Sequence, residues 1–241
     1  MTNRLDSFIE AYGERFAYSF DNDLILNWYP KRILDKVPAS ARVLELGVGH
    51  GYTTLRFARY FARTLVVDGS AAVIEKFRAE HPECTAEIVE SYFESFETEE
   101  RFDVIVMGFV LEHVVDPALV LRHFKRFLVP GGRCFVAVPN GESMHRRLGH
   151  SAGLLADMMA LGQGDRELGH LRQYSKASLL DLLEKAGYHI CAIEGIFLKP
   201  FTTAQLLQLD LSPAITDALC QLAIGYPELS CALLAEAEPH G

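Results

Sequence analysis

The sequence lacks two common signatures. Its five cysteines are odd in number and far apart, and no CxxC pair is present, which excludes the usual zinc and redox motifs. No run approaches the roughly 18 apolar residues of a membrane span, and residues 1–10 have neither the basic start nor the apolar stretch of a secretion signal. We therefore expect a cytoplasmic protein that is not bound to a membrane. We also expect reduced, buried thiols at Cys84, Cys134, Cys191, Cys220 and Cys231.

Positive charge is also scarce. The chain has 23 Lys and Arg side chains against 32 Asp and Glu side chains, a formal net charge of -9. Because nucleic-acid binding depends on neutralising backbone phosphates with Lys and Arg, this balance excludes a broad nucleic-acid surface. The 241 residues are 49% hydrophobic and 23% charged, which indicates a folded chain with a substantial core rather than a disordered one.

Short apolar runs alternate with helical patterns along most of the chain. This alternation predicts an α/β fold with helices packed on a mainly parallel sheet. The expected strands are 42–46, 64–68, 85–89, 103–107, 133–138, 188–197 and 229–236. The expected helices are 52–61, 71–80, one that starts at Asp116-Pro117 and includes Leu128, and 176–185. Pro130-Gly131-Gly132 is expected to turn the chain into the strand that follows.

A glycine-rich turn follows the first expected strand. Gly47, Gly49 and Gly51 would let this turn approach a ligand closely, and Asp68, at the end of the second strand, could accept the hydroxyls of a ribose. The spacing is GxGxG rather than the dinucleotide GxGxxG, and Glu45 lies two residues before the first glycine. A carboxylate there would oppose a pyrophosphate but favour an ammonium or sulfonium group. The turn therefore favours S-adenosylmethionine over a nicotinamide cofactor.

Five motifs in order resemble the class I S-adenosylmethionine-dependent methyltransferases, in the small-molecule branch that includes ubiquinone-biosynthesis enzymes. The motifs are VLELGVGHGYTT, VVDGS, FDVIVMGFVLEHVVDP, LVPGGRCFVAVPN and GHLRQYSKASLLDLLEKAGY. The resemblance implies a Rossmann-like sheet of seven strands, mainly parallel with the last strand antiparallel, and helices on both faces. It also implies that S-adenosylmethionine is the methyl donor and S-adenosylhomocysteine the product.

The resemblance assigns cofactor contacts to a set of residues at the carboxyl ends of the strands. These are Glu45, Gly47, Gly49, Gly51, Asp68, Gly69, Ser70, Ser91, Tyr92, Phe109 and His113. One departure concerns the adenine, because Ser91 stands where the family usually has Asp. Either the Ser91 hydroxyl makes this contact, or Tyr92 and Phe93 stack on the base; Ser91 and Tyr92 are the predicted pair. Phe109 either packs on the sulfonium or belongs to the core, and His113 either supports the helix start or acts as a base.

Basic residues gather after the fifth expected strand, in an otherwise acidic protein. Three histidines are candidate general bases: His145, then His150 and His170. The candidate acceptor-binding residues are Tyr18, Trp28, Asn140, Arg146, Arg172 and Tyr174. These side chains could bind an anionic acceptor, or they could form a solvated helix face. No carboxylate completes a metal site with His145 and His150, which lie five residues apart, so no metal is expected.

We expect a single methyltransferase domain over residues 1–241. Its expected parts are a helical lid at 1–38, a cofactor-binding core at 39–139, a substrate-side insertion at 140–175, and a C-terminal helix and hairpin at 176–241 with an insertion at 198–228. The predicted function is methyl transfer to an O, N or C atom of a small-molecule acceptor, by a monomer or homodimer. The alternatives are a nicotinamide-dependent oxidoreductase and a methyltransferase-like binding protein without turnover.

Overall fold

Seven strands form one sheet in the computed structural model, which describes residues 19–240. The strands are β1 (Arg42–Leu46), β2 (Arg63–Asp68), β3 (Glu87–Glu90), β4 (Phe102–Gly108), β5 (Leu128–Pro139), β6 (Tyr188–Ile196) and β7 (Ala232–Pro239). Their order is β3-β2-β1-β4-β5-β7-β6, and β7 runs antiparallel to both of its neighbours. Each pair of neighbouring strands from β3 to β5 in this order is parallel. The predicted Rossmann-like sheet with an antiparallel last strand is confirmed.

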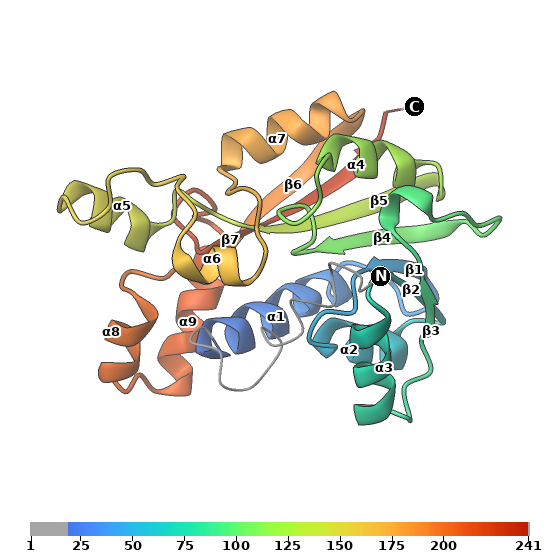
Figure 1. The fold of residues 1–241 in the computed structure, drawn as a ribbon, viewed down its shortest axis with the longest axis horizontal. Coiled ribbons are helices and arrows are strands. Elements are labelled where there is room, and N and C mark those ends of the chain that lie inside the picture. Colours follow the sequence, from blue (N-terminus) through green and yellow to red (C-terminus); the bar gives the residue numbers. More distant parts are fainter. Residues whose placement is uncertain (1–18, 241) are drawn as a thin grey trace.

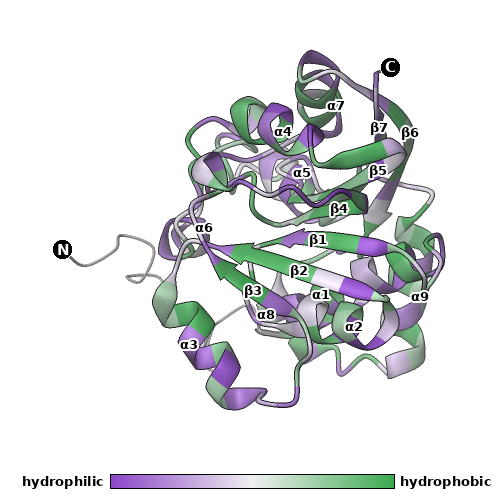
Figure 2. Cartoon of the chain, turned by 90° about the vertical axis from the view of Figure 1, so that its right-hand side faces the viewer, coloured by the Kyte–Doolittle hydropathy of each residue, from purple (hydrophilic) through white to green (hydrophobic). Residues whose placement is uncertain are grey.

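Helices cover both faces of this sheet. They are α1 (Ser19–Leu34), α2 (Tyr52–Tyr60), α3 (Ala71–Glu80), α4 (Pro117–Lys125), α5 (Met144–Ser151), α6 (Gln163–Glu167), α7 (Lys176–Lys185), α8 (Thr203–Gln208) and α9 (Pro213–Ala223). Figure 1 shows α4 and α7 on one face and α1, α2 and α3 on the other. Because helices cover both faces, the central strands consist mainly of buried apolar residues. Figure 2 shows these strands as largely green arrows.

Local signals set most helix boundaries. The helices at 71–80 and 176–185 have the predicted bounds. Asp116 caps α4 as expected, since its Oδ1 accepts a hydrogen bond of 2.9 Å from the backbone N–H of Leu119. Within the part of the chain that the structure describes, no helix is long and apolar enough to cross a membrane.

The largest differences from the expected boundaries are in β5, α4 and β7. Strand β5 begins at Leu128 rather than at 133, because Leu128 pairs with Phe102 before the chain bulges through Pro130-Gly131-Gly132. Helix α4 correspondingly ends at Lys125, before Leu128. Strand β7 begins three residues later than predicted, at Ala232, because residues 229–231 belong to the turn after α9.

Cysteine burial was predicted correctly only in part. All five thiols are free, as expected, and Cys134 and Cys220 are buried. Cys191, however, is exposed. It lies on the edge strand β6, where neighbouring side chains alternate between the covered and the open face.

The N-terminal segment that was predicted to form a helical lid contains α1 in the part that the structure describes, and its role as a lid stays a prediction. Helix α1 packs against the sheet in the same apolar cluster as Val43 and Phe57, and its Ile33 is fully buried. Trp28, predicted to contact the acceptor, is only 7% exposed within this cluster. Apolar residues at helical spacing therefore mark a core helix here. The predicted contact at Tyr18 lies outside the described residues.

The insertion between β6 and β7 forms α8 and α9, and Gly195 fixes it to the hairpin. A Cβ atom at Gly195 would overlap the Oγ of Ser230 and the carbonyl oxygen of Ala223. We expect Gly195→Ala to lower the free energy of unfolding by about 3 kcal/mol, because the close approach cannot hold an added methyl group. Urea denaturation measures this change.

Gly149→Ala is the matched control for that variant. Gly149 lies within α5, and an added Cβ would lie 3.6 Å from the Cβ of Leu155, an ordinary contact. This substitution should leave stability unchanged or raise it by about 0.5–1 kcal/mol. Equal stability of the Gly195→Ala variant and the wild type would contradict the close packing of the insertion against β6.

Candidate functional site

The carboxyl ends of β1, β2 and β4 meet where the strand order reverses. This is the place where open α/β sheets bind ligands. Helix α6 lies beyond the tips of the strands: the arrow of β4 points toward it in Figure 1, and those of β1 and β2 end on its side in Figure 2. The site is therefore bordered by the glycine turn after β1, the end of β2 and the loop after β4.

The glycine turn after β1 has positive φ angles, which residues with a side chain rarely adopt. Gly47, Gly49 and Gly51 have φ angles of 82°, 52° and 79°. A Cβ at Gly51 would lie 2.6 Å from the ring of Phe77 in α3. The predicted turn is thus present, and its glycines are needed for both its conformation and its packing.

Asp68 connects this turn to the start of α3. Its Oδ2 accepts a hydrogen bond of 2.8 Å from the backbone N–H of Val48, and its Oδ1 accepts one of 2.8 Å from the N–H of Ser70. The Ser70 hydroxyl in turn caps α3 by accepting from the N–H of Val73. Asp68 therefore holds the glycine turn and the start of α3 in shape, and its contact with a ribose remains a prediction.

Glu45 places a buried carboxylate beneath the turn. It is 3% exposed, and its Oε2 accepts a hydrogen bond of 2.8 Å from the Thr54 hydroxyl. Burial raises the pKa of Glu45 to about 8; the charge of Asp68 adds to this, and the Thr54 bond opposes it. A cationic ligand would favour the ionised form of this carboxyl group.

Phe109 occupies a strained position directly after β4. Its φ is 57°, a left-handed conformation that is uncommon for a bulky residue. Its backbone N–H donates to the carbonyl of Ala137, and its ring meets Tyr29 edge to face at 5.6 Å. Tyr29 is held by a 2.8 Å hydrogen bond between its hydroxyl and that of Thr53. Sequence reasoning missed Tyr29, because only the docking of α1 brings it to this loop.

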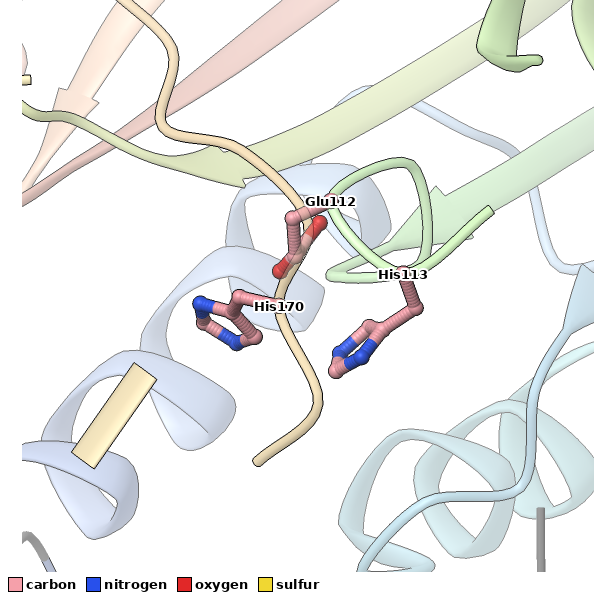
Figure 3. A group of neighbouring side chains, drawn as sticks. All are labelled: Glu112, His113 and His170. Atoms are coloured by element: carbon pink, nitrogen blue, oxygen red, sulfur yellow. The ribbon is translucent and has the colours of Figure 1, made fainter. Parts of the chain in front are cut away.

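Glu112, His113 and His170 come together beside the same loop. Figure 3 shows the three side chains pointing toward one another, two from the loop after β4 and one from the segment between α6 and α7. One ligand atom of each lies within 4.8 Å of the others. Burial raises the pKa of Glu112 to about 7 and lowers that of His113 to about 3.

The expectation that no metal is bound stays a prediction, although it did not consider this group of side chains. It considered His145 and His150, whereas the structure brings Glu112 and His113 to His170. Sequence spacing could not reveal this grouping, because His170 comes from a different segment of the chain. The Glu-His pair after β4 was the one available signal.

Arg172 and Tyr174 hold the loop after β4. The guanidinium of Arg172 donates to the carbonyls of Leu111, Val114 and Val115 at 2.5–3.1 Å. The Tyr174 hydroxyl donates to the same Leu111 carbonyl at 3.1 Å. These contacts favour a positioning role over the predicted contact with an acceptor.

Arg146 and Asn140 make similar backbone contacts. Arg146 donates to the carbonyls of Gly141, Met158 and Ala160. The Asn140 amide nitrogen donates at 2.9 Å to the carbonyl of Ser230, in the turn before β7. Both side chains therefore fasten the segment after β5, and an anionic acceptor would have to compete with these carbonyls.

His145 and His150 lie in α5. Burial, with the charges of Lys199 and Arg146, lowers the pKa of His145 to about 3, which makes it a weak proton acceptor. His150 has its Nδ1 at 2.9 Å from the Leu155 carbonyl on an exposed part of the helix. Of the three predicted bases, the structure brings His170 to the loop after β4.

The predicted adenine contacts lie at the end of β3. The Ser91 backbone N–H donates to the Asp68 carbonyl, and its side chain donates to the Tyr92 carbonyl at 3.0 Å. Tyr92 is 53% exposed. Both residues are therefore adjacent to the ribose-binding candidate, and their contact with adenine stays a prediction.

Comparison with known proteins places the chain in a family. The sequence model of the methyltransferase domain matches residues 23–193. The ubiquinone biosynthesis O-methyltransferase of Xanthomonas axonopodis pv. citri is 27% identical over 170 residues, which cover 68% of this chain and 69% of that protein.

Two solved structures share the fold. An S-adenosylmethionine-dependent methyltransferase of Thermotoga maritima, described as a possible histamine N-methyltransferase, is 20% identical with a TM-score of 0.65, and the match covers 97% of each chain. The 1,6-didemethyltoxoflavin-N1-methyltransferase of Burkholderia thailandensis, with bound 1,6-didemethyltoxoflavin and S-adenosylhomocysteine, is 16% identical with a TM-score of 0.65, and the match covers 98% of this chain and 87% of that one. The resemblance to class I S-adenosylmethionine-dependent methyltransferases is confirmed, and the chain belongs to the methyltransferase domain family.

Proposed function

We propose that this enzyme transfers the methyl group of S-adenosylmethionine to an oxygen atom of a small molecule and releases S-adenosylhomocysteine. The family match supports methyl transfer. The name of the Xanthomonas relative, an O-methyltransferase, supports oxygen over nitrogen or carbon. A nicotinamide-dependent oxidoreductase is disfavoured because the ionised form of Glu45 would repel a pyrophosphate at the glycine turn.

Glu45 is the observation that carries the proposal. Its carboxyl group is buried beside the turn, with a pKa of about 8, and the hydrogen bond from Thr54 offsets only part of the cost of ionising it. The ammonium or sulfonium group of the donor would stabilise the ionised form in this low-dielectric position. Asp68, one strand away, would accept the ribose hydroxyls while it keeps the turn in shape.

Positioning is the main chemical task of such a site. The sulfonium methyl is already electrophilic, so the protein has to hold the acceptor oxygen in line behind the methyl carbon and let its proton leave. Positioning can contribute about 7–11 kcal/mol to lowering the barrier. Phe109 and Tyr29 form an apolar wall beside the loop after β4, suited to a flat acceptor and to excluding water.

A transfer experiment tests the proposed acceptor class. The protein is incubated with donor carrying a ¹³C-methyl group and with three matched sets of small acceptors: phenols, aromatic amines and activated carbon acids. We expect the label on a phenolic oxygen, identified by mass spectrometry and NMR. Label found only on nitrogen or carbon, or no transfer to any set, would contradict the proposal.

A further inference from the structure

A buried carboxylate lies without a partner beside the loop after β4. The Glu112 side chain is fully buried, and neither of its oxygens has a hydrogen-bond partner among residues 19–240. An unpaired buried carboxylate is costly, so such groups are normally hydrogen-bonded, paired with a cation or bound to a metal ion. The two side chains that face it are both imidazoles, His113 and His170.

The three side chains have the geometry of an open coordination site. Their ligand atoms all lie within 4.8 Å of one another, and the two rings meet edge to face at 4.7 Å. Ligand atoms at about 2.0–2.2 Å from a shared ion lie roughly 3–4 Å apart. Side-chain shifts of about 1 Å would therefore close the group around an ion.

Each histidine also has a polar neighbour on its outer side. The Asp165 Oδ1 lies 3.3 Å from the Nδ1 of His170, and the Gly169 carbonyl binds the ring of His113. Metal-binding histidines almost always donate their second ring nitrogen to a carboxylate or a backbone carbonyl, which fixes the orientation of the ring. His113 has such a partner, whereas the Asp165 carboxylate lies beside His170 Nδ1 without forming a hydrogen bond to it, and this arrangement leaves the Nε2 of His170 for a ligand.

The surrounding charges suit a divalent cation. Glu112 and Asp165 together supply two carboxylates at this point. Arg146, whose charge also acts on Asp165, donates to three backbone carbonyls, and Arg172 has its guanidinium committed to the carbonyls of the loop after β4. A doubly charged ion would balance the two carboxylates without displacing either guanidinium.

We propose that Glu112, His113 and His170 bind one divalent first-row transition-metal ion. Two imidazoles and one carboxylate with open positions are a common ligand set for such ions, including zinc and iron. The loop that supplies two of the ligands also carries Phe109. An acceptor hydroxyl could take an open position on the ion; this role rests on the proposed function, whereas metal binding does not.

Metal titration of the full chain tests the site. Metal-free protein carrying Cys191→Ser, which removes the exposed thiol, is titrated with Co²⁺ followed by visible absorption and with Zn²⁺ followed by calorimetry. We expect one ion per chain. Glu112→Gln and His170→Gln should weaken binding by at least about 100-fold, and Asp165→Asn by about 10–100-fold.

The control is His123→Asn, which removes a half-buried histidine that binds the Phe96 carbonyl. It should bind both ions as the parent protein does. Far-UV circular dichroism checks that each variant is folded, and Asp165→Asn, whose side chain is 19% exposed, tests the site if a ligand variant does not fold. Unchanged affinity in the folded variants, or no ion bound to the parent, would overturn the site. Because neither donor nor acceptor is present, these outcomes are independent of methyl transfer.

Discussion

Asp68→Ala should weaken binding of S-adenosylhomocysteine by at least about 100-fold, or about 2.7 kcal/mol. The substitution removes the proposed ribose acceptor and leaves the backbone N–H groups of Val48 and Ser70 without the carboxylate that holds them. The lost hydrogen bonds should also lower the free energy of unfolding by about 2–4 kcal/mol. Calorimetry measures the affinity, and urea denaturation measures the stability.

Asp103→Ala separates cofactor binding from general destabilisation. Asp103 lies at the start of β4, at the opposite end of the sheet, where its Oδ2 accepts a hydrogen bond of 2.8 Å from the backbone N–H of Arg42. This variant should lose stability while cofactor affinity stays within about threefold of the wild type. If Asp68→Ala and Asp103→Ala bound the cofactor equally well, the ribose assignment would be wrong.

Glu45→Gln should make the ligand-free protein more stable than the wild type at high pH. The Glu45 pKa is raised from its usual value of 4.5 to about 8 in the folded chain. Between these values the folded state keeps a proton that the unfolded state releases, so stability falls as pH rises through this window. The difference between the variant and the wild type should reach about 3–5 kcal/mol by pH 9. Denaturation curves at pH 5, 7 and 9 measure it.

The same carboxyl group predicts pH-dependent donor binding. A cationic donor binds the ionised form of Glu45, so wild-type affinity should rise from pH 6 to about pH 8 and then level off. Binding near pH 7 should release a proton, which calorimetry in buffers of different ionisation enthalpy detects. Glu45→Gln should show neither effect. The same pH dependence in both proteins would show that another group is responsible.

Local signals in the sequence were sufficient to predict the sheet and the glycine turn. The glycine turn and Asp68 depend on short-range rules of backbone conformation and on the position where a strand ends, and both are present as predicted. Helix capping at Asp116 is equally local. These features are predictable because each depends on a few neighbouring residues.

The acceptor side could not be predicted in the same way. Arg146 and Arg172 suggested an anion site, but both guanidinium groups donate to backbone carbonyls that only the folded chain brings to them. His170 meets Glu112 because the segment after α6 returns to the loop after β4. Trp28, an aromatic residue of the predicted lid, lies in the core, the usual place for apolar side chains at helical spacing.

Separate titrations with two ligands of the glycine turn test the central claim most directly. Wild-type protein is titrated by calorimetry with S-adenosylhomocysteine and, separately, with NADH, and the Asp68→Ala variant is titrated in parallel. The acidic turn formed around Glu45 and Asp68 predicts binding of one S-adenosylhomocysteine per chain, no measurable binding of NADH, and loss of the former in the variant. Binding of NADH without S-adenosylhomocysteine would contradict the account.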